Sequence, residues 1–208
     1  MISPERAARR RQEFARRGHD ILDVTERLML VAGIRRVTVE EIAVETGIGK
    51  GTIYKHFDSK HALLIALVMR YQNRLMDHVS GIDDPEKQLA AWITVQLSDP
   101  DRGALMDRLV RHLADDPEAR QAMSEGADRM RRVLGKIVSA RLPHSDIPPM
   151  MVVEWFESLV MGLRTLYAAP IRPEGLDPDS LVATAIAAIP RLLGDVKRSN
   201  DSPKVTYL

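Results

Sequence analysis

Hydrophobic residues recur at helical spacing along most of the chain. Near the amino terminus Ile21, Leu22, Leu28, Met29 and Ala32 fall on one face of a 3.6-residue repeat. Alternating runs of β-branched residues, which are typical of strands, are hard to find, and aromatic residues make up only 4% of the chain. The pattern therefore predicts an all-α protein of about nine helices.

The second helix has a recognisable beginning. Thr38 and Glu41 have the spacing of a capping box, in which each side chain accepts a hydrogen bond from the backbone amide of the other residue. Val37 and Ile42 have the positions of a hydrophobic staple across the same helix start. With Gly33 ending the first helix, these residues predict a second helix over about 39–46.

A third short helix follows after a turn that contains glycine. Gly47 ends the second helix, and Gly49 is an acceptable N-cap for a helix over residues 50–57. Ala43 supplies a small residue where the two helices cross, while Ile53 and Phe57 are four residues apart and should face inward. Two short helices with these features are typical of a helix-turn-helix.

Longer amphipathic helices fill the rest of the chain. Asp58 and Ser59 begin one that ends near Gly81. Further helical patterns, separated by prolines, cover about 85–98, 102–115, 117–141, 149–169 and 178–193. Pro190 should kink or restart the last helix, and residues 197–208 are predicted to be a flexible tail.

Composition and charge narrow the function. The net charge is only +1, but six arginines crowd into residues 1–17. This basic arm favours a polyanionic partner, and a solvated, disordered tail is the alternative. Cysteine is absent, which excludes disulfides, thiolate metal sites and a cysteine nucleophile. With no signal peptide or membrane-spanning stretch in view, we expect a cytoplasmic protein without a membrane or cofactor.

The third helix carries the most distinctive chemistry. If Ile53 and Phe57 face inward, polar residues remain on its exposed or flanking faces. Gly51 among them costs roughly 1 kcal/mol of helix propensity relative to alanine, but permits close approach to a phosphate or base edge. These positions are Lys50, Gly51, Thr52, Lys55 and His56.

The stretch from Thr38 to Leu63 reads T-V-E-E-I-A-V-E-T-G-I-G-K-G-T-I-Y-K-H-F-D-S-K-H-A-L and resembles the DNA-binding signature of the TetR family of repressors. The resemblance implies a three-helix DNA-binding domain at 18–61, behind the arm at 1–17. It implies a helical effector-binding and dimerisation domain at 62–196. Family members bind palindromic operators as homodimers and release them when a small molecule binds.

The resemblance also implies particular DNA contacts. Thr38 and Lys60 would contact phosphates, whereas Lys50, Gly51 and Thr52 would meet bases or backbone. Tyr54, Lys55 and His56 complete the predicted interface. Alternatively, Thr38 is only a cap, Tyr54 a core aromatic and Lys60 a solvated lysine. The chain departs from the family at Gly49, which often is serine, and at His61, where an acidic residue is common.

The carboxy-terminal two-thirds are less informative. Apolar side chains there are either core or the lining of a cavity for a small apolar ligand. The predicted pocket comprises Trp92, Met106, Leu109, Met123, Met130, Trp155, Met161 and Tyr167. The last two helices could pair across a two-fold axis as a four-helix bundle. The predicted dimer interface comprises Val152, Val153, Phe156, Leu159, Val160, Leu163, Leu181, Val182, Ile186 and Ile189.

Other classes of function have weaker support. Residues 47–52 superficially look like a phosphate-binding loop, but Gly51 breaks the Gly-Lys-Ser/Thr order and no strand precedes them. His112, Asp115, Asp116 and Glu118 offer metal ligands, although such acidic residues usually are solvated caps. A helical ligand-binding protein whose helix-turn-helix only packs remains the main rival to a repressor, and we expect no enzyme activity.

Overall fold

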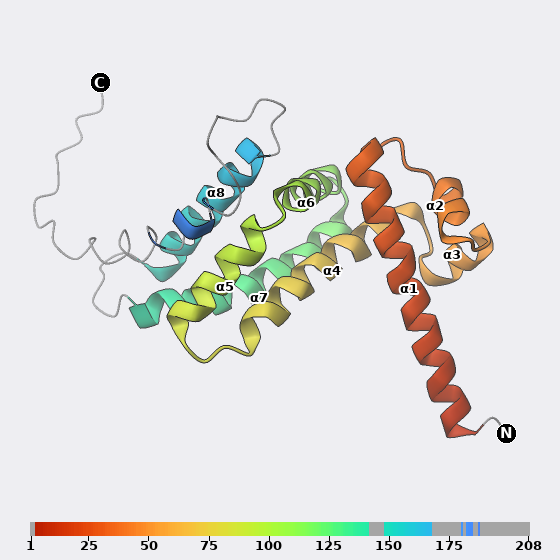
Figure 1. Cartoon of the computed structure of the whole chain (residues 1–208), viewed down its shortest axis with the longest axis horizontal. Coiled ribbons are helices and arrows are strands. Elements are labelled where there is room, and N and C mark those ends of the chain that lie inside the picture. The colour runs from red at the N-terminus through yellow and green to blue at the C-terminus, as the bar shows by residue number, and fades with distance from the viewer. Residues whose placement is uncertain (1–2, 142–147, 168–179, 181, 185–186, 188–208) are drawn as a thin grey trace, which may run out of the picture. The chain divides into compact units, whose positions relative to one another are not determined.

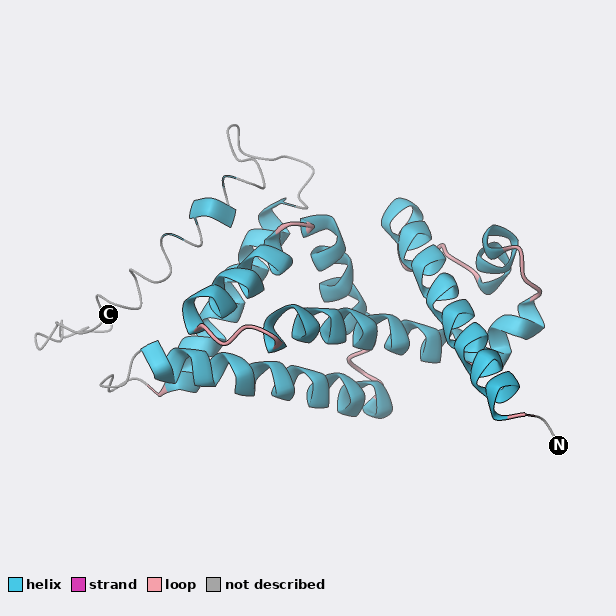
Figure 2. Cartoon of the chain, turned by 60° about the horizontal axis from the view of Figure 1, so that its bottom comes forward, coloured by secondary structure: helices cyan, strands magenta, loops and turns pink. Residues whose placement is uncertain are grey.

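The computed structural model describes residues 3–141, 148–167, 180, 182–184 and 187, and its regular elements are helices (Figure 1). No strand occurs among these described residues (Figure 2), which confirms the all-α prediction. The helices are α1 (Pro4–Ala32), α2 (Val39–Thr46), α3 (Lys50–His56), α4 (Lys60–Ser80), α5 (Pro85–Leu97), α6 (Pro100–His112), α7 (Pro117–Arg141) and α8 (Pro149–Tyr167). The predicted helix over 178–193 and tail over 197–208 lie largely or wholly outside the described residues, as do Leu181, Ile186 and Ile189.

Helix α1 differs most from its prediction, because it takes in the arginine-rich start of the chain. Ser3 accepts a hydrogen bond from the backbone amide of Arg6 at 3.3 Å, and Pro4 occupies the first turn. Serine caps and first-turn prolines favour a helix start, and Glu5 complements the positive end of the helix dipole. The basic residues are thus helical, and a disordered tail is the wrong interpretation of them.

The chain divides into two compact units. The first comprises residues 1–71 and 105–125, and the second comprises 72–104 and 126–208. Helices α4, α6 and α7 therefore each contribute to both units. The first unit takes in more of the chain than the predicted DNA-binding range of 18–61, because parts of α6 and α7 join it.

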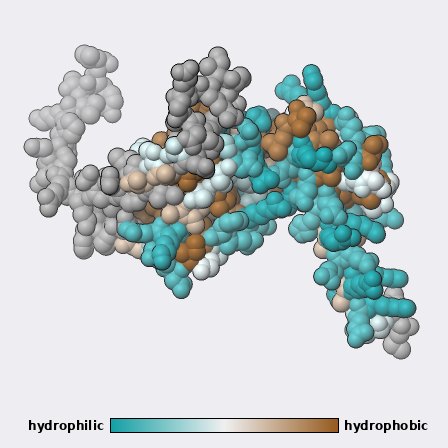
Figure 3. Space-filling model, viewed as in Figure 1, coloured by the Kyte–Doolittle hydropathy of each residue, from teal (hydrophilic) through white to brown (hydrophobic). Residues whose placement is uncertain are grey.

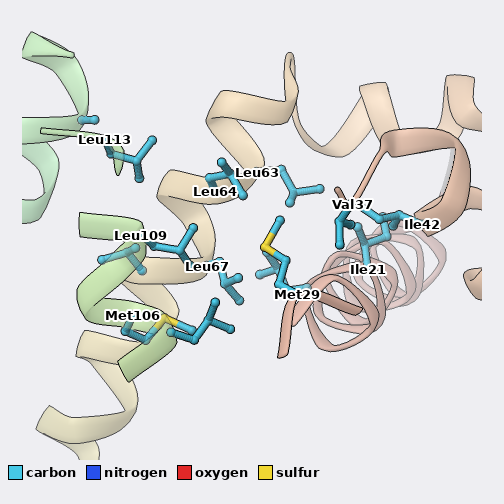
Figure 4. Packing of buried hydrophobic residues seen from close by; sticks show 14 of the residues in the cluster. Ile21, Met29, Val37, Ile42, Leu63, Leu64, Leu67, Met106, Leu109 and Leu113 are labelled. Carbon is cyan, nitrogen blue, oxygen red and sulfur yellow. The ribbon is translucent and has the colours of Figure 1, made fainter. Parts of the chain in front are cut away.

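A single hydrophobic cluster holds the first unit together (Figure 4). Ile21 and Met29 of α1, Ile42 of α2 and Ile53 of α3 are each at most 1% exposed. Leu67 of α4 is fully buried against them. Burial of one such side chain is worth about 1.5–3 kcal/mol, so this cluster fixes the short helices α2 and α3 on the longer ones.

A buried ionic network fastens α4 to α1 within the same unit. Arg70 of α4 is 8% exposed, and its two terminal nitrogens donate to Asp23 at 2.6 Å and to Glu26 at 2.7 Å. Glu26, like Arg70, is buried, and loss of one partner from such a buried pair typically costs about 3–5 kcal/mol because the remaining charge is left uncompensated, whereas the Asp23 side chain is 59% exposed. Arg70 therefore fixes the register of α4 against α1.

The second unit has its own core, in which α5 packs on α8. The rings of Trp92 and Phe156 lie 5.1 Å apart, and both side chains are buried. Buried Arg164 donates to Gln96 at 2.5 Å, and Gly103 leaves space for its side chain. In the part of the chain that is described, no helix has the length and apolar character needed to cross a membrane.

Candidate DNA-binding interface

Helix α2 begins with the capping box that the sequence predicts. The Thr38 hydroxyl accepts from the Glu41 amide at 3.2 Å, and the Thr38 amide donates to the Glu41 carboxylate at 2.7 Å. Val37 and Ile42 are both buried in the core of the first unit (Figure 4). Thr38 is therefore a cap, and its exposed position also leaves it open to the predicted phosphate contact.

The turn between α2 and α3 also follows the prediction. Gly47 has a φ of 69°, a left-handed conformation that side-chain-bearing residues rarely adopt. Gly49 is the N-cap of α3, and Ile53, 1% exposed, anchors this helix in the core. The arrangement is a helix-turn-helix with one face of α3 held inward and the other left to solvent.

The outer face of α3 is polar and open. Lys50, Gly51 and Lys55 are exposed, Thr52 is half-buried, and Tyr54 is 40% exposed. Tyr54 is thus not a core aromatic. A Cβ atom added at Gly51 would meet nothing within 4 Å, so packing within the chain does not require glycine there.

Lys50 has an acidic partner on α2. Its ammonium forms an ion pair with Glu40 and lies 5.8 Å from the centre of the Tyr54 ring. The hydrogen bond to Glu40 raises the pKa of Lys50, and the same bond lowers the pKa of Glu40. Lys50 is therefore fully charged at neutral pH, but it must leave Glu40 to contact DNA directly.

Two other predicted contacts have local partners. His56 stacks on Phe14 of α1, with ring centroids 3.8 Å apart and planes inclined by 20°. Burial, assisted by the charge of Arg17, lowers the pKa of His56. The ammonium of Lys60, which is half-buried, donates to the backbone carbonyl of Val37. His56 therefore links α3 to α1. Lys60 links the start of α4 to the segment just before α2.

His61, where the family often has an acidic residue, lies against an aspartate within the first unit. Its Nε2 lies 3.1 Å from Oδ2 of Asp116. Asp116 also caps α7 by accepting from the Ala119 amide at 2.7 Å, and this bond, with a smaller contribution from His61, lowers the pKa of Asp116. Among the described residues, no three His, Asp or Glu side chains gather as metal ligands around His112 or elsewhere.

The predicted pocket residues do not share one environment. Met106, Leu109 and Met123 are buried in the first unit, and Trp92 and Met130 in the second. By contrast Trp155 is 51% exposed and Met161 44% exposed, so neither lines an enclosed cavity of its own unit. Tyr167 ends α8, and its side chain lies outside the described residues.

Most of the predicted dimer residues that the structure describes are buried or half-buried within the chain itself. Val152, Val153, Phe156 and Val160 are buried in the chain's own core, whereas Leu163 and Val182 are half-buried. Leu159, at 36% exposed, is accessible. The surface of α8 instead carries a mainly apolar line at helical spacing, which we name the α8 stripe: Met151, Trp155, Leu159, Gly162 and Leu166.

Several structural residues were not singled out from the sequence. Phe14 and the network of Arg70 with Asp23 and Glu26 join segments far apart in the chain, so no local pattern marks them. The Ser3-Pro4-Glu5 start of α1 did carry a signal, since serine, proline and an acidic residue are typical of a helix beginning.

Comparison with known proteins supports the DNA-binding assignment. Residues 21–67 match the family model described as bacterial regulatory proteins, tetR family. The HTH-type transcriptional regulator YerO of Bacillus subtilis is 34% identical over 85 residues, which cover 38% of this chain and 29% of that protein. The chain thus spans less than a third of this relative.

A longer match reaches the HTH-type transcriptional repressor AcnR of Corynebacterium efficiens, at 26% identity over 76% of this chain and 85% of that protein. A TetR-family regulator structure from Rhodococcus sp. shares the fold with a TM-score of 0.69 and 18% identity, covering 86% of this chain and 99% of that one.

The fold also matches a crystal structure of AibR in complex with isovaleryl coenzyme A and operator DNA. Its TM-score is 0.64 at 18% identity, and the match covers 83% of this chain and 97% of AibR. The helix-turn-helix and the family match over residues 21–67 show that the chain carries a DNA-binding domain of the tetR type, and the rest of the chain shares its all-α fold with solved TetR-family regulators.

Proposed function

We propose that the chain is a transcriptional regulator of the TetR family, a cytoplasmic repressor that binds a palindromic operator as a homodimer and is released by a small apolar ligand. The observation that carries the proposal is the outer face of α3. It presents Lys50, Tyr54 and Lys55 to solvent beside the open position at Gly51, while Ile53 anchors the helix from behind.

This face has the chemistry needed for double-stranded DNA. Lysines neutralise phosphates or donate to guanine, and Thr52 and Tyr54 supply hydroxyl groups for phosphate or base contacts. Gly51 lets the backbone of α3 come close to the groove because no side chain intervenes. Thr38, His56 and Lys60 flank the face, and we propose that they add phosphate contacts.

A homodimer would supply the two-fold symmetry of a palindrome. The α8 stripe is an exposed apolar surface of the kind that a second copy covers, and burial of apolar area stabilises such an interface by about 25 cal/mol per Å². Two copies of α3 would then enter successive major grooves, roughly 34 Å apart. The relative AcnR, which is named as a repressor, supports the sign of regulation.

The ligand proposal rests on the apolar interior of the helical region. Each unit offers its own candidates for contact with a small apolar molecule: Trp92 and Met130 in the second unit, or Met106, Leu109 and Met123 in the first. AibR holds both a ligand and operator DNA, so the fold accommodates both. Coupling must be reciprocal, and DNA should weaken ligand binding by the factor by which the ligand weakens DNA binding.

The test is binding of the purified protein to DNA from its own upstream intergenic region, compared with a scrambled duplex across a salt series. We expect preference for the natural sequence, and a log-log salt slope of about −0.9 per phosphate contact. Lys50→Glu should abolish the preference. Equal, weak binding of both duplexes would favour the rival, a helical ligand-binding protein whose helix-turn-helix only packs.

A further inference from the structure

The amino-terminal part of α1 is an exposed, strongly basic helix. We name residues 4–17 the α1 extension. It contains six arginines but only two acidic residues, Glu5 and Glu13. In Figure 3 this part of α1, identified by its place in Figure 1, has a mainly hydrophilic surface. Such a helix would be solvated anyway, so its charge alone does not assign it a partner.

A specific contact ties the α1 extension to the recognition helix α3. Phe14, although 51% exposed, stacks on His56 at the carboxy-terminal end of α3, with 3.8 Å between ring centroids. One turn later the backbone of α1 comes close to the same ring, because a Cβ at Gly18 would lie 3.5 Å from its Nδ1. The α1 extension therefore has a defined position beside α3 within one compact unit.

Helical geometry then separates the arginines into two sides. Arg10, Arg11 and Arg17 stand four residues before, three residues before and three residues after Phe14, so all three share the side of α1 that meets α3. Arg10 and Arg17 are only about 20° apart around the helix, whereas Arg11 lies about 100° from Arg10. Their neighbours Arg9 and Arg16 point to the opposite side, since each residue turns the helix by about 100°. The charge of Arg17 is close enough to contribute to the lowered pKa of His56.

The two sides also differ in their acidic partners. On the far side Arg9 forms an ion pair with Glu13 at 3.2 Å. In the described ranges of the chain, no carboxylate forms an ion pair with Arg10 or Arg17. The guanidinium groups of Arg10 and Arg17, which have no acidic partner among the described residues, thus lie together on the side of α1 adjacent to α3.

We propose that Arg10 and Arg17 form a second contact with the DNA backbone, held in place by the Phe14–His56 stack. Guanidinium groups bind phosphate oxygens bidentately, and such contacts add affinity without reading sequence. The proposal rests on the proposed function, because α3 must lie on DNA for these arginines to reach it. It assigns the α1 extension a role in strengthening and orienting the complex.

The test compares two double variants that remove equal charge from adjacent positions. Arg10→Gln/Arg17→Gln should weaken binding to operator and scrambled DNA by a similar factor and make the salt slope shallower by about 0.9 per lost phosphate contact. Arg9→Gln/Arg16→Gln should leave affinity and slope close to those of the wild type. Circular dichroism of both variants checks that α1 remains helical.

A third variant tests the Phe14–His56 stack separately from the charges. Phe14→Ala keeps every charge but removes the stack, and it should weaken DNA binding in the same direction as Arg10→Gln/Arg17→Gln. Equal losses in the two arginine variants, no loss in either, or unaltered binding by Phe14→Ala would overturn the proposal. Lys50→Glu on the same duplexes tests the proposed function separately. Loss of sequence preference in this variant supports recognition through α3, whatever the arginine variants show.

Discussion

Two helices of this protein expose chemically different surfaces, a charged one on α3 and an apolar one on α8. Helix α3 buries Ile53 and exposes lysines and a tyrosine around Gly51, whereas α8 buries valines and a phenylalanine and still exposes Met151, Trp155 and Leu166. A charged, hydrated face suits a polyanion, because its contacts replace counterions and water. An apolar face gains from exclusion of water, which suits another protein chain. Under the proposed function, DNA recognition and self-association therefore belong to different units.

The largest expected effect comes from breaking the α8 stripe. Trp155→Glu places a charge at the centre of this surface but leaves the buried core untouched, so the chain should fold and become monomeric. DNA affinity should fall on the order of 100-fold, because two half-sites are no longer bound by linked domains. Analytical ultracentrifugation measures the association state, and DNA titration measures the affinity.

The matched control for this change is Thr165→Glu, which adds the same charge at an exposed position of α8 outside the stripe. It should remain dimeric and bind DNA normally. A dimeric Trp155→Glu protein would show that self-association uses another surface, and it would contradict the proposal that the α8 stripe is the dimer interface.

A smaller effect should come from freeing Lys50. Glu40→Gln removes the ion pair and one negative charge from the DNA-facing side, so DNA binding should tighten by roughly threefold to tenfold, consistent with the modest value of exposed ion pairs. Fluorescence anisotropy with labelled operator DNA would measure the change. Glu45→Gln is the control, because Glu45 is also on α2 and pairs with Arg27 of α1 at 2.8 Å. Weaker binding by Glu40→Gln would show instead that Glu40 orients Lys50 for DNA.

The smallest effect concerns pH. Burial and Arg17 lower the pKa of His56 from 6.5, so the fold favours the neutral ring. The corresponding stability is present above about pH 6.5 and is lost as the pH falls through the lowered value. Between pH ~7.5 and ~5.5 the melting temperature of the wild type should fall more than that of His56→Phe. The difference should be no more than a few degrees, because His56 is only half-buried and solvent screens its charge. If the melting temperatures of the wild type and His56→Phe depend on pH in the same way, the titration of His56 does not affect stability, which would contradict this prediction.

Local signals explain why the helix-turn-helix was predictable. The Thr38–Glu41 capping box, the glycine turn and the inward position of Ile53 depend on residues within a few positions of each other, and the structure confirms them. The resemblance to the family added the function of this segment. The amino-terminal part of α1 was not predicted. Its arginines were interpreted only as a charged arm, although Ser3 and Pro4 are typical of a helix start.

The roles along α8 were harder to predict because this helix is apolar on more than one side. Phe156 was expected at a dimer interface and is 3% exposed, whereas its neighbour Trp155 was expected in a pocket and is 51% exposed. Both residues are large aromatic side chains on one apolar helix, and only tertiary packing distinguishes the core side from the outer side. The buried ion pairs of Arg70 likewise depend on partners more than forty residues away.

The most direct test of the account is a hydroxyl-radical footprint of the protein on its upstream intergenic DNA. A homodimer that inserts two copies of α3 predicts two protected patches, related by two-fold symmetry and centred roughly 34 Å, or one helical turn, apart. Lys50→Glu should lose both patches together. A single asymmetric patch, or protection spread evenly along the duplex, would contradict recognition of a palindrome through α3.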